Sequence, residues 1–246
     1  MISFLLAMAA IQAPAAADQA KACADLVRTA PDRAVQTANE WRLQGGGLLA
    51  RECLALAYVE LERWPAAAVE FEQAALEAEA KRDVVSAQYW AQSGNAWLAD
   101  GDPVKARRAL DAALATSGMM PELRGEALFD RARAFVEQGD VQTARADIDK
   151  GLALVPADPF GWYLSAALAR RAKDLVRAKA DIAKATELAP NDADILLEAG
   201  NIAGLSGDAD IARAFYARAA KAAPDSPAGR AAGAALAADQ ETGPPE

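Results

Sequence analysis

The feature that most constrains the fold is a 34-residue repeat in the second half of the chain. Prolines, alanines and aspartates each recur three times at this interval. The recurring positions are Pro156, Pro190 and Pro224; Ala144, Ala178 and Ala212; and Asp140, Asp174 and Asp208. Because each unit of a repeat array contacts only its neighbours, a chain of 246 residues can fold as one stack of units.

Each repeat carries the pattern of two helices. Apolar residues recur at i, i+3 and i+4 over two stretches of about 12 to 15 residues. Between these stretches, pairs such as Gly139-Asp140 and Gly207-Asp208 predict a helix that ends at a glycine and a second helix capped by aspartate. The closing proline cannot continue a helix and sets the repeat boundary. The alanines lie where the two helices cross, where a larger side chain would force them apart. We therefore predict an all-α chain of helical hairpins.

These positions resemble the tetratricopeptide repeat (TPR), a 34-residue hairpin with large, small, aromatic and proline residues at fixed offsets. One frame carries Leu196, Ala199, Gly200, Ala203, Ala212, Tyr216 and Pro224, and another carries Trp90, Ser93, Gly94, Trp97, Ala106 and Leu110. The resemblance implies a right-handed α-α superhelix, a solenoid of antiparallel hairpins. The expected hairpins span about 48–81, 87–120, 125–158, 159–192 and 193–226, with a capping helix pair at 18–47 and a capping helix and disordered tail at 227–246.

The N-terminus has the pattern of a secretory signal. A short apolar run from Phe4 to Ile11 is followed by small residues up to Ala17. The run is shorter than the roughly 20 residues that cross a bilayer. No Lys or Arg precedes it, which leaves an ordinary apolar first helix as the alternative. We expect a signal peptide at 1–17, export to a bacterial periplasm, and no membrane span in the mature chain.

The cysteine and histidine content indicates which covalent, metal-binding and catalytic chemistry the chain can support. Cys23 and Cys53 are the two cysteines of the sequence, and in an oxidising compartment they are expected to form a disulfide. The alternative is two separately buried thiols, which pack as small apolar groups. Histidine is absent, so the usual general base and the commonest metal ligand are missing. Two thiols without histidine cannot complete a four-ligand zinc site. We expect no metal, no cofactor and no catalytic residues.

The charge argues against a nucleic-acid partner, whereas the protein or peptide partner that we expect is implied by the TPR resemblance. Asp and Glu outnumber Lys and Arg by 35 to 26, which gives a formal net charge of −9. Binding to nucleic acid depends on Lys and Arg that neutralise phosphates, so we expect no nucleic-acid partner.

The resemblance also implies a binding surface, because the first helix of each TPR hairpin lines a concave groove that receives an extended peptide or a helix. The groove positions carried over to this chain are Gln88, Gln92, Asn95, Phe129, Arg133, Phe160, Tyr163, Arg170, Arg171, Leu197 and Asn201. The amides of Asn95 and Asn201 can donate to and accept from a peptide bond, although both residues also fit the bare repeat consensus. The arginines can bind a carboxylate or simply remain solvated.

One ligand class is disfavoured. TPR proteins that clamp a terminal carboxylate use a set of Lys and Asn residues, and the corresponding positions here hold Ala91, Phe129 and Tyr163. We therefore expect a non-catalytic scaffold that binds a partner segment in its groove. The alternative is a structural subunit of a cell-envelope assembly or secretion complex that uses its outer face, and an enzyme is the least favoured class.

Overall fold

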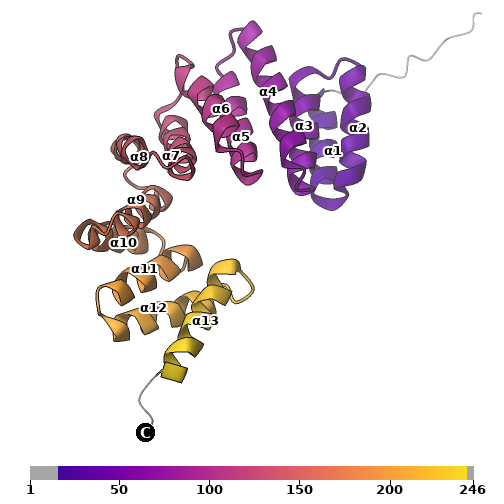
Figure 1. Ribbon diagram of the computed structural model, residues 1–246. Helices are drawn as coiled ribbons and strands as arrows, with labels where there is room; N and C mark the ends of the chain where they lie inside the picture. The colour runs from indigo at the N-terminus through magenta and orange to yellow at the C-terminus, as the bar shows by residue number, and fades with distance from the viewer. Residues whose placement is uncertain (1–15, 243–246) are drawn as a thin grey trace, which may run out of the picture. The chain divides into compact units, whose positions relative to one another are not determined.

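The computed structural model describes residues 16–242, with side chains up to residue 238, and this part of the chain is all-helical (Figure 1). Most of the expected signal peptide, residues 1–15, lies outside the described residues. The helices are α1 (Ala16–Thr29), α2 (Pro31–Leu43), α3 (Gly47–Glu60), α4 (Trp64–Ala80), α5 (Ser86–Ala99), α6 (Pro103–Ala115), α7 (Pro121–Glu137), α8 (Val141–Leu154), α9 (Pro159–Arg171), α10 (Leu175–Leu188), α11 (Ala193–Leu205), α12 (Ala209–Ala222) and α13 (Pro227–Thr242). The all-α prediction is confirmed.

The chain divides into two compact units, Met1–Gly101 and Asp102–Glu246. Within each unit, consecutive helices joined by short loops pack on each other, as α3 does with α4 and α7 with α8. None of the described helices combines the length and the apolar character that crossing a membrane requires. The fold is therefore a TPR-type array of helical hairpins.

Small residues allow the helices of a hairpin to approach closely. The alanines that recur at 34-residue intervals, Ala144, Ala178 and Ala212, are all buried in the described structure. Their short side chains leave room for the facing helix, and a larger side chain would have to displace it. The repeat signal in the sequence thus marks the crossing points of the helices.

In the second unit, the turns between paired helices follow the predicted Gly-Asp chemistry, with two exceptions. Gly139 has a φ of 81°, and the Asp140 carboxylate accepts a hydrogen bond of 3.0 Å from the backbone N–H of Thr143. Asp208 makes no such cap, and its carboxylate instead accepts a 3.0 Å bond from Nζ of Lys179. Lys173 occupies the position that is glycine in the neighbouring repeats, and it has a φ of 62°. A Cβ in this left-handed region is strained, so the turn carries a local cost.

Replacing Lys173 by glycine is expected to raise the free energy of unfolding by about 0.5–1 kcal/mol, because glycine adopts a positive φ without a Cβ penalty. Thermal and urea unfolding followed by circular dichroism measure the change. The reverse substitution Gly139→Lys, at the equivalent turn of the preceding hairpin, should lower stability by a similar amount. Equal melting temperatures for Lys173→Gly, Gly139→Lys and the unaltered chain would show that a lysine costs no more stability than a glycine at these turns.

A disulfide between Cys23 and Cys53 joins α1 to α3 in the first unit. Both residues are buried in a small core with Val27, Trp41 and Leu54. The bond closes a sequence separation of 30 residues and holds the N-terminal helix, the end of an array at which fraying starts. This finding agrees with the pairing expected from the sequence.

Replacing both Cys23 and Cys53 by alanine is expected to destabilise the first unit by about 3–4 kcal/mol, because closing a loop of this length restricts the unfolded chain. Thermal unfolding together with limited proteolysis of α1 measures the loss. In the unaltered protein, reducing agent should lower the melting temperature, and in the double variant it should have no effect. Insensitivity of the unaltered protein to reduction, with free thiols trapped by alkylation, would contradict the assignment.

Candidate functional site

A groove with a volume of 530 Å³ runs over α7, α9 and α11, the first helices of three successive hairpins of the second unit. We call it the inner groove. Its apolar part comes from Ala132 on α7, from Leu164, Ala167 and Leu168 on α9, and from Ile195 on α11. Helix α9 also packs directly against α7 and α11, so the three helices form a continuous surface. The sequence pattern places side chains of neighbouring hairpins side by side on this surface.

An aromatic platform stands at one side of the inner groove. The rings of Phe160 and Tyr163 are stacked, with centroids 6.1 Å apart, and Phe160 is 39% exposed. The guanidinium of Arg133, from α7, lies 6.0 Å from the centroid of the Phe160 ring and donates a 3.1 Å hydrogen bond to Asp130. Burial raises the pKa of the Tyr163 phenol, and the charges of Glu198 and Asp194 raise it further, so the phenol stays protonated. The predicted residues Arg133, Phe160 and Tyr163 are therefore brought together in this groove.

Two other predicted groove residues are engaged inside the protein. Nε of Arg170 donates a 2.6 Å hydrogen bond to the buried carboxylate of Glu198. The Asn201 amide donates to the same carboxylate at 3.4 Å and accepts a 3.1 Å bond from the Tyr216 hydroxyl. This network ties α9, α11 and α12 together. Sequence reasoning missed Glu198, although a carboxylate at helical spacing before Asn201 is a signal for such a pair.

Phe129 was predicted to line the groove, and the structure corrects this. Its side chain is 0% exposed and belongs to the core formed with Ile148, Leu152 and Leu168. The ring lies against Gly151 of α8 and Gly161 of α9, which have no side chains to exclude it. Phe129 therefore holds helices together and is not presented to a ligand.

The predicted residues Gln88, Gln92 and Asn95 lie on α5 and belong to the first unit, whereas the inner groove belongs to the second. Gln88 and Asn95 are exposed, whereas Gln92 is half-buried. The Oε1 atom of Gln92 is buried and has no hydrogen-bond partner among the described residues. These three residues stay a predicted binding face of the first unit. Of the remaining predicted residues, Arg171 lines the inner groove and Leu197 packs half-buried near Leu196.

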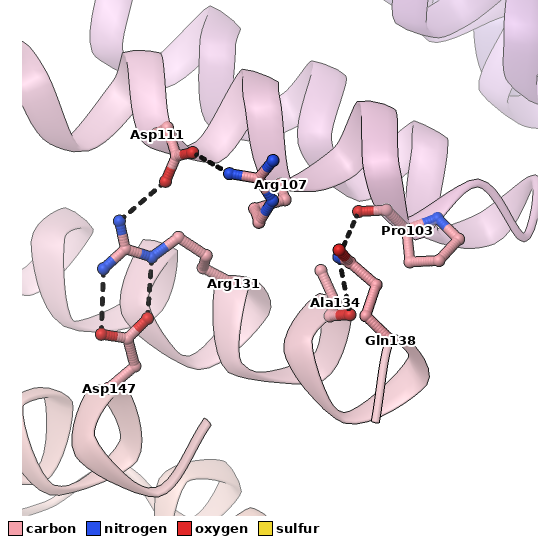
Figure 2. Close-up of polar contacts among 7 residues, drawn as sticks. All are labelled: Pro103, Arg107, Asp111, Arg131, Ala134, Gln138 and Asp147. Atoms are coloured by element: carbon pink, nitrogen blue, oxygen red, sulfur yellow. Dashed lines mark hydrogen bonds and ion pairs between the residues drawn. The ribbon is translucent and has the colours of Figure 1, made fainter. Parts of the chain in front are cut away.

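Buried hydrogen bonds and ion pairs between helices, which we call polar ties, hold together the helices that carry the inner groove. Figure 2 shows the Arg131 guanidinium of α7 between two carboxylates: it binds Asp147 of α8 with two bonds of 2.7 and 2.9 Å, and Asp111 of α6 with one of 2.8 Å. Asp147 is only 2% exposed, so the stability of its buried charge depends on this bidentate ion pair with Arg131. One repeat later, Ser165 donates to the buried Asp181 at 2.5 Å, and Arg145 donates to Ser165 at 2.6 Å. Equivalent positions of two repeats therefore carry a polar tie.

Replacing Asp147 by alanine is expected to lower the free energy of unfolding of the second unit by about 3 kcal/mol, because Arg131 keeps its charge and loses its buried partner. Chemical denaturation followed by circular dichroism measures the loss. The matched control Asp210→Ala removes an exposed ion pair with Arg213 on α12 and should cost less than about 0.5 kcal/mol. Similar losses in both variants would show that the buried tie contributes no more than a surface pair.

A second groove, with a volume of 500 Å³, lies over α10, α11 and α12, and we call it the outer groove. Its lining is mostly apolar and includes Ile182, Ile202, Phe215 and Ile211, which is 53% exposed. The charged residues at its rim already have partners. Lys179 pairs with Asp208 at 3.0 Å, and Arg218 donates to the carbonyl oxygen of Pro190 at 2.7 Å. The outer groove therefore offers an apolar surface with few free charges.

No protein-family model matches this sequence, and no curated protein matches it in sequence. Several solved structures are similar in fold. PilW, described as a widely conserved type IV pilus biogenesis factor, is 20% identical with a TM-score of 0.71, over 89% of this chain and 99% of that chain. A tetratricopeptide repeat protein from Parabacteroides merdae is 15% identical with a TM-score of 0.68, over 90% and 83% of the two chains. YrrB, described as a TPR protein with an unusual peptide-binding site, is 15% identical with a TM-score of 0.52, over 80% and 96%. At these identities the likeness shows the TPR fold alone.

Proposed function

We propose that this chain is a non-catalytic scaffold that binds a segment of a partner protein in the inner groove. The observation that carries the proposal is the stacked Phe160–Tyr163 platform, in which Phe160 is exposed and Tyr163 half-buried, beside an apolar floor within a groove of 530 Å³. Aromatic and arginine side chains are the residues that most often dominate binding energy at protein interfaces. Arg133 over the Phe160 ring supplies both kinds of group on neighbouring helices.

Location in a bacterial periplasm is part of the same proposal. The Cys23–Cys53 disulfide supports it, because disulfides persist in oxidising compartments and are rare in the cytosol. The likeness in fold to a type IV pilus biogenesis factor is compatible with a role at the cell envelope. Alkylation of free thiols in separated cell fractions, before and after reduction, tests the location, and free thiols in a cytosolic fraction would contradict it.

A structural subunit of an envelope assembly or secretion complex is the second candidate, and the outer groove favours it. Ile211 and Phe215 leave apolar surface accessible there, and a contiguous apolar surface of this kind is typical of an interface between proteins. In this alternative the partner covers the second helices of the hairpins and the inner groove is not used.

Matched double variants distinguish the two surfaces. Phe160→Ala with Arg133→Ala removes one apolar and one arginine side chain from the inner groove, and Ile211→Ala with Arg218→Ala does the same in the outer groove. We expect the first pair to reduce partner capture in in-cell crosslinking about tenfold or more, since central aromatic and arginine contacts carry most binding energy. The second pair should leave capture unchanged.

The opposite result, loss of capture only with the outer variants, would reject the inner groove and favour the structural subunit. Thermal unfolding of each variant serves as the control for folding. Capture that survives both pairs of substitutions would reject both grooves as partner sites.

A further inference from the structure

The charges that line the inner groove are unevenly balanced. Glu137, Asp192 and Asp194 face it, and the guanidinium groups along it are those of Arg133 and Arg171. Arg133 already pairs with Asp130 at 3.1 Å. Along the same surface, Arg170 forms an ion pair with Glu198, so these two charges neutralise each other. The carboxylates of the groove are therefore only partly compensated by the protein.

The negative charge continues along α7 beyond the groove. Glu122, Glu126 and Asp130 follow one another at intervals of four, which places them on one face of that helix. Burial raises the pKa of the Glu126 carboxyl, and the charges of Asp158, Asp130 and Glu122 raise it further. Several carboxylates thus lie close enough to repel one another. Asp158 also accepts a 2.8 Å hydrogen bond from the backbone N–H of Phe160, which places this charge beside the aromatic platform.

The outer groove has a different electrostatic character. Four charged residues line it: Lys179, Glu187, Asp208 and Arg218. Lys179 pairs with Asp208 across the rim, and Glu187 pairs at 2.9 Å with Lys184, which lies outside the lining. Arg218 is bonded to a carbonyl oxygen. Its charges of opposite sign therefore compensate one another. The excess of negative charge is a property of the inner groove and not of every hollow of the second unit.

We infer that the inner groove selects a cationic segment of its partner protein, in which Lys or Arg side chains alternate with apolar ones. This inference rests on the function proposed above and specifies the chemistry of the partner. Lys and Arg of the segment neutralise carboxylates such as Glu137 and Asp194, while its apolar side chains cover the floor around Ala167 and Ile195. An anionic segment would meet an excess of carboxylates of its own sign.

A displayed library of random linear peptides, selected on the full chain, tests this chemistry. Each binder is retested on the inner-groove variant Phe160→Ala with Tyr163→Ala and on the outer-groove variant Ile211→Ala with Phe215→Ala, which remove aromatic and apolar side chains and leave the charges of both grooves unchanged. We expect the binders that are lost only with the inner-groove variant to be enriched in Lys and Arg over the other binders. Binders that depend on the inner groove but are neutral or acidic would overturn the inference and leave the proposed function standing. A selection without any binder that depends on the inner groove would overturn both.

Charge reversal then tests the mechanism with a synthetic peptide from the selected set. Glu137→Lys with Asp194→Lys is expected to weaken its binding about tenfold, whereas the control Glu187→Lys with Asp210→Lys on α10 and α12 should leave binding unchanged. Fluorescence anisotropy measures both affinities. Affinity for the unaltered chain should also fall with added salt, because the Debye length shrinks from about 10 Å at 0.1 M to about 3 Å at 1 M. Equal losses in the two reversal variants, or binding that is insensitive to salt, would overturn the inference.

Discussion

The second unit depends on how closely its helices approach one another around Phe129. The ring of this residue reaches from α7 into the space between α8 and α9, where two glycines leave room for it. A Cβ added at Gly151 would lie 2.4 Å from Cε1 of the ring, and one added at Gly161 would lie 2.3 Å from Cζ. Since real side-chain contacts are much longer, either addition would push a helix outward. One ring therefore sets the spacing within a hairpin and between that hairpin and the next, and the inner groove exists because α7 and α9 are held at this distance.

Apolar packing sets the distance between helices, and the polar ties set their register. Arg131 can bind both oxygens of Asp147 only when α7 and α8 are aligned along their axes, because a guanidinium and a carboxylate form two parallel bonds in one geometry. Ser165 and Asp181 occupy the equivalent positions one repeat later and make the same connection with different groups. Apolar surfaces of similar shape can slide over one another, whereas a buried carboxylate without its partner is costly. These ties fix where the groove side chains of α7 and α9 stand relative to each other.

The sequence alone predicted the elements of this fold better than the burial and the contacts of the side chains at the inner groove. A repeat of 34 residues reports helix crossings and turns directly, because Ala144 or Gly139 is required by local sterics. The position of a residue within the repeat also indicates which side of a helix it occupies, which is why Arg133, Phe160 and Tyr163 lie on one surface as expected. It does not tell how deep that residue lies or which partner it meets. Phe129 is buried because of glycines on two other helices, and the Asn201 amide is engaged because its oxygen accepts a hydrogen bond from Tyr216 of the next helix. Such contacts depend on tertiary packing, which a repeat consensus does not describe.

The negative charge of the inner groove follows from where the arginines of the chain are bonded. In the second unit, arginines such as Arg131, Arg145 and Arg177 are bonded to acceptors on neighbouring helices, where they hold successive repeats together. A sequence with a net charge of −9 that uses its guanidinium groups in this way leaves carboxylates in excess elsewhere. On an open surface such an excess is screened by water and salt, but over an apolar groove floor the screening is weaker. The same arginines that stabilise the array therefore leave its inner face negative, and the chemistry of the partner follows from the way in which the repeats are joined.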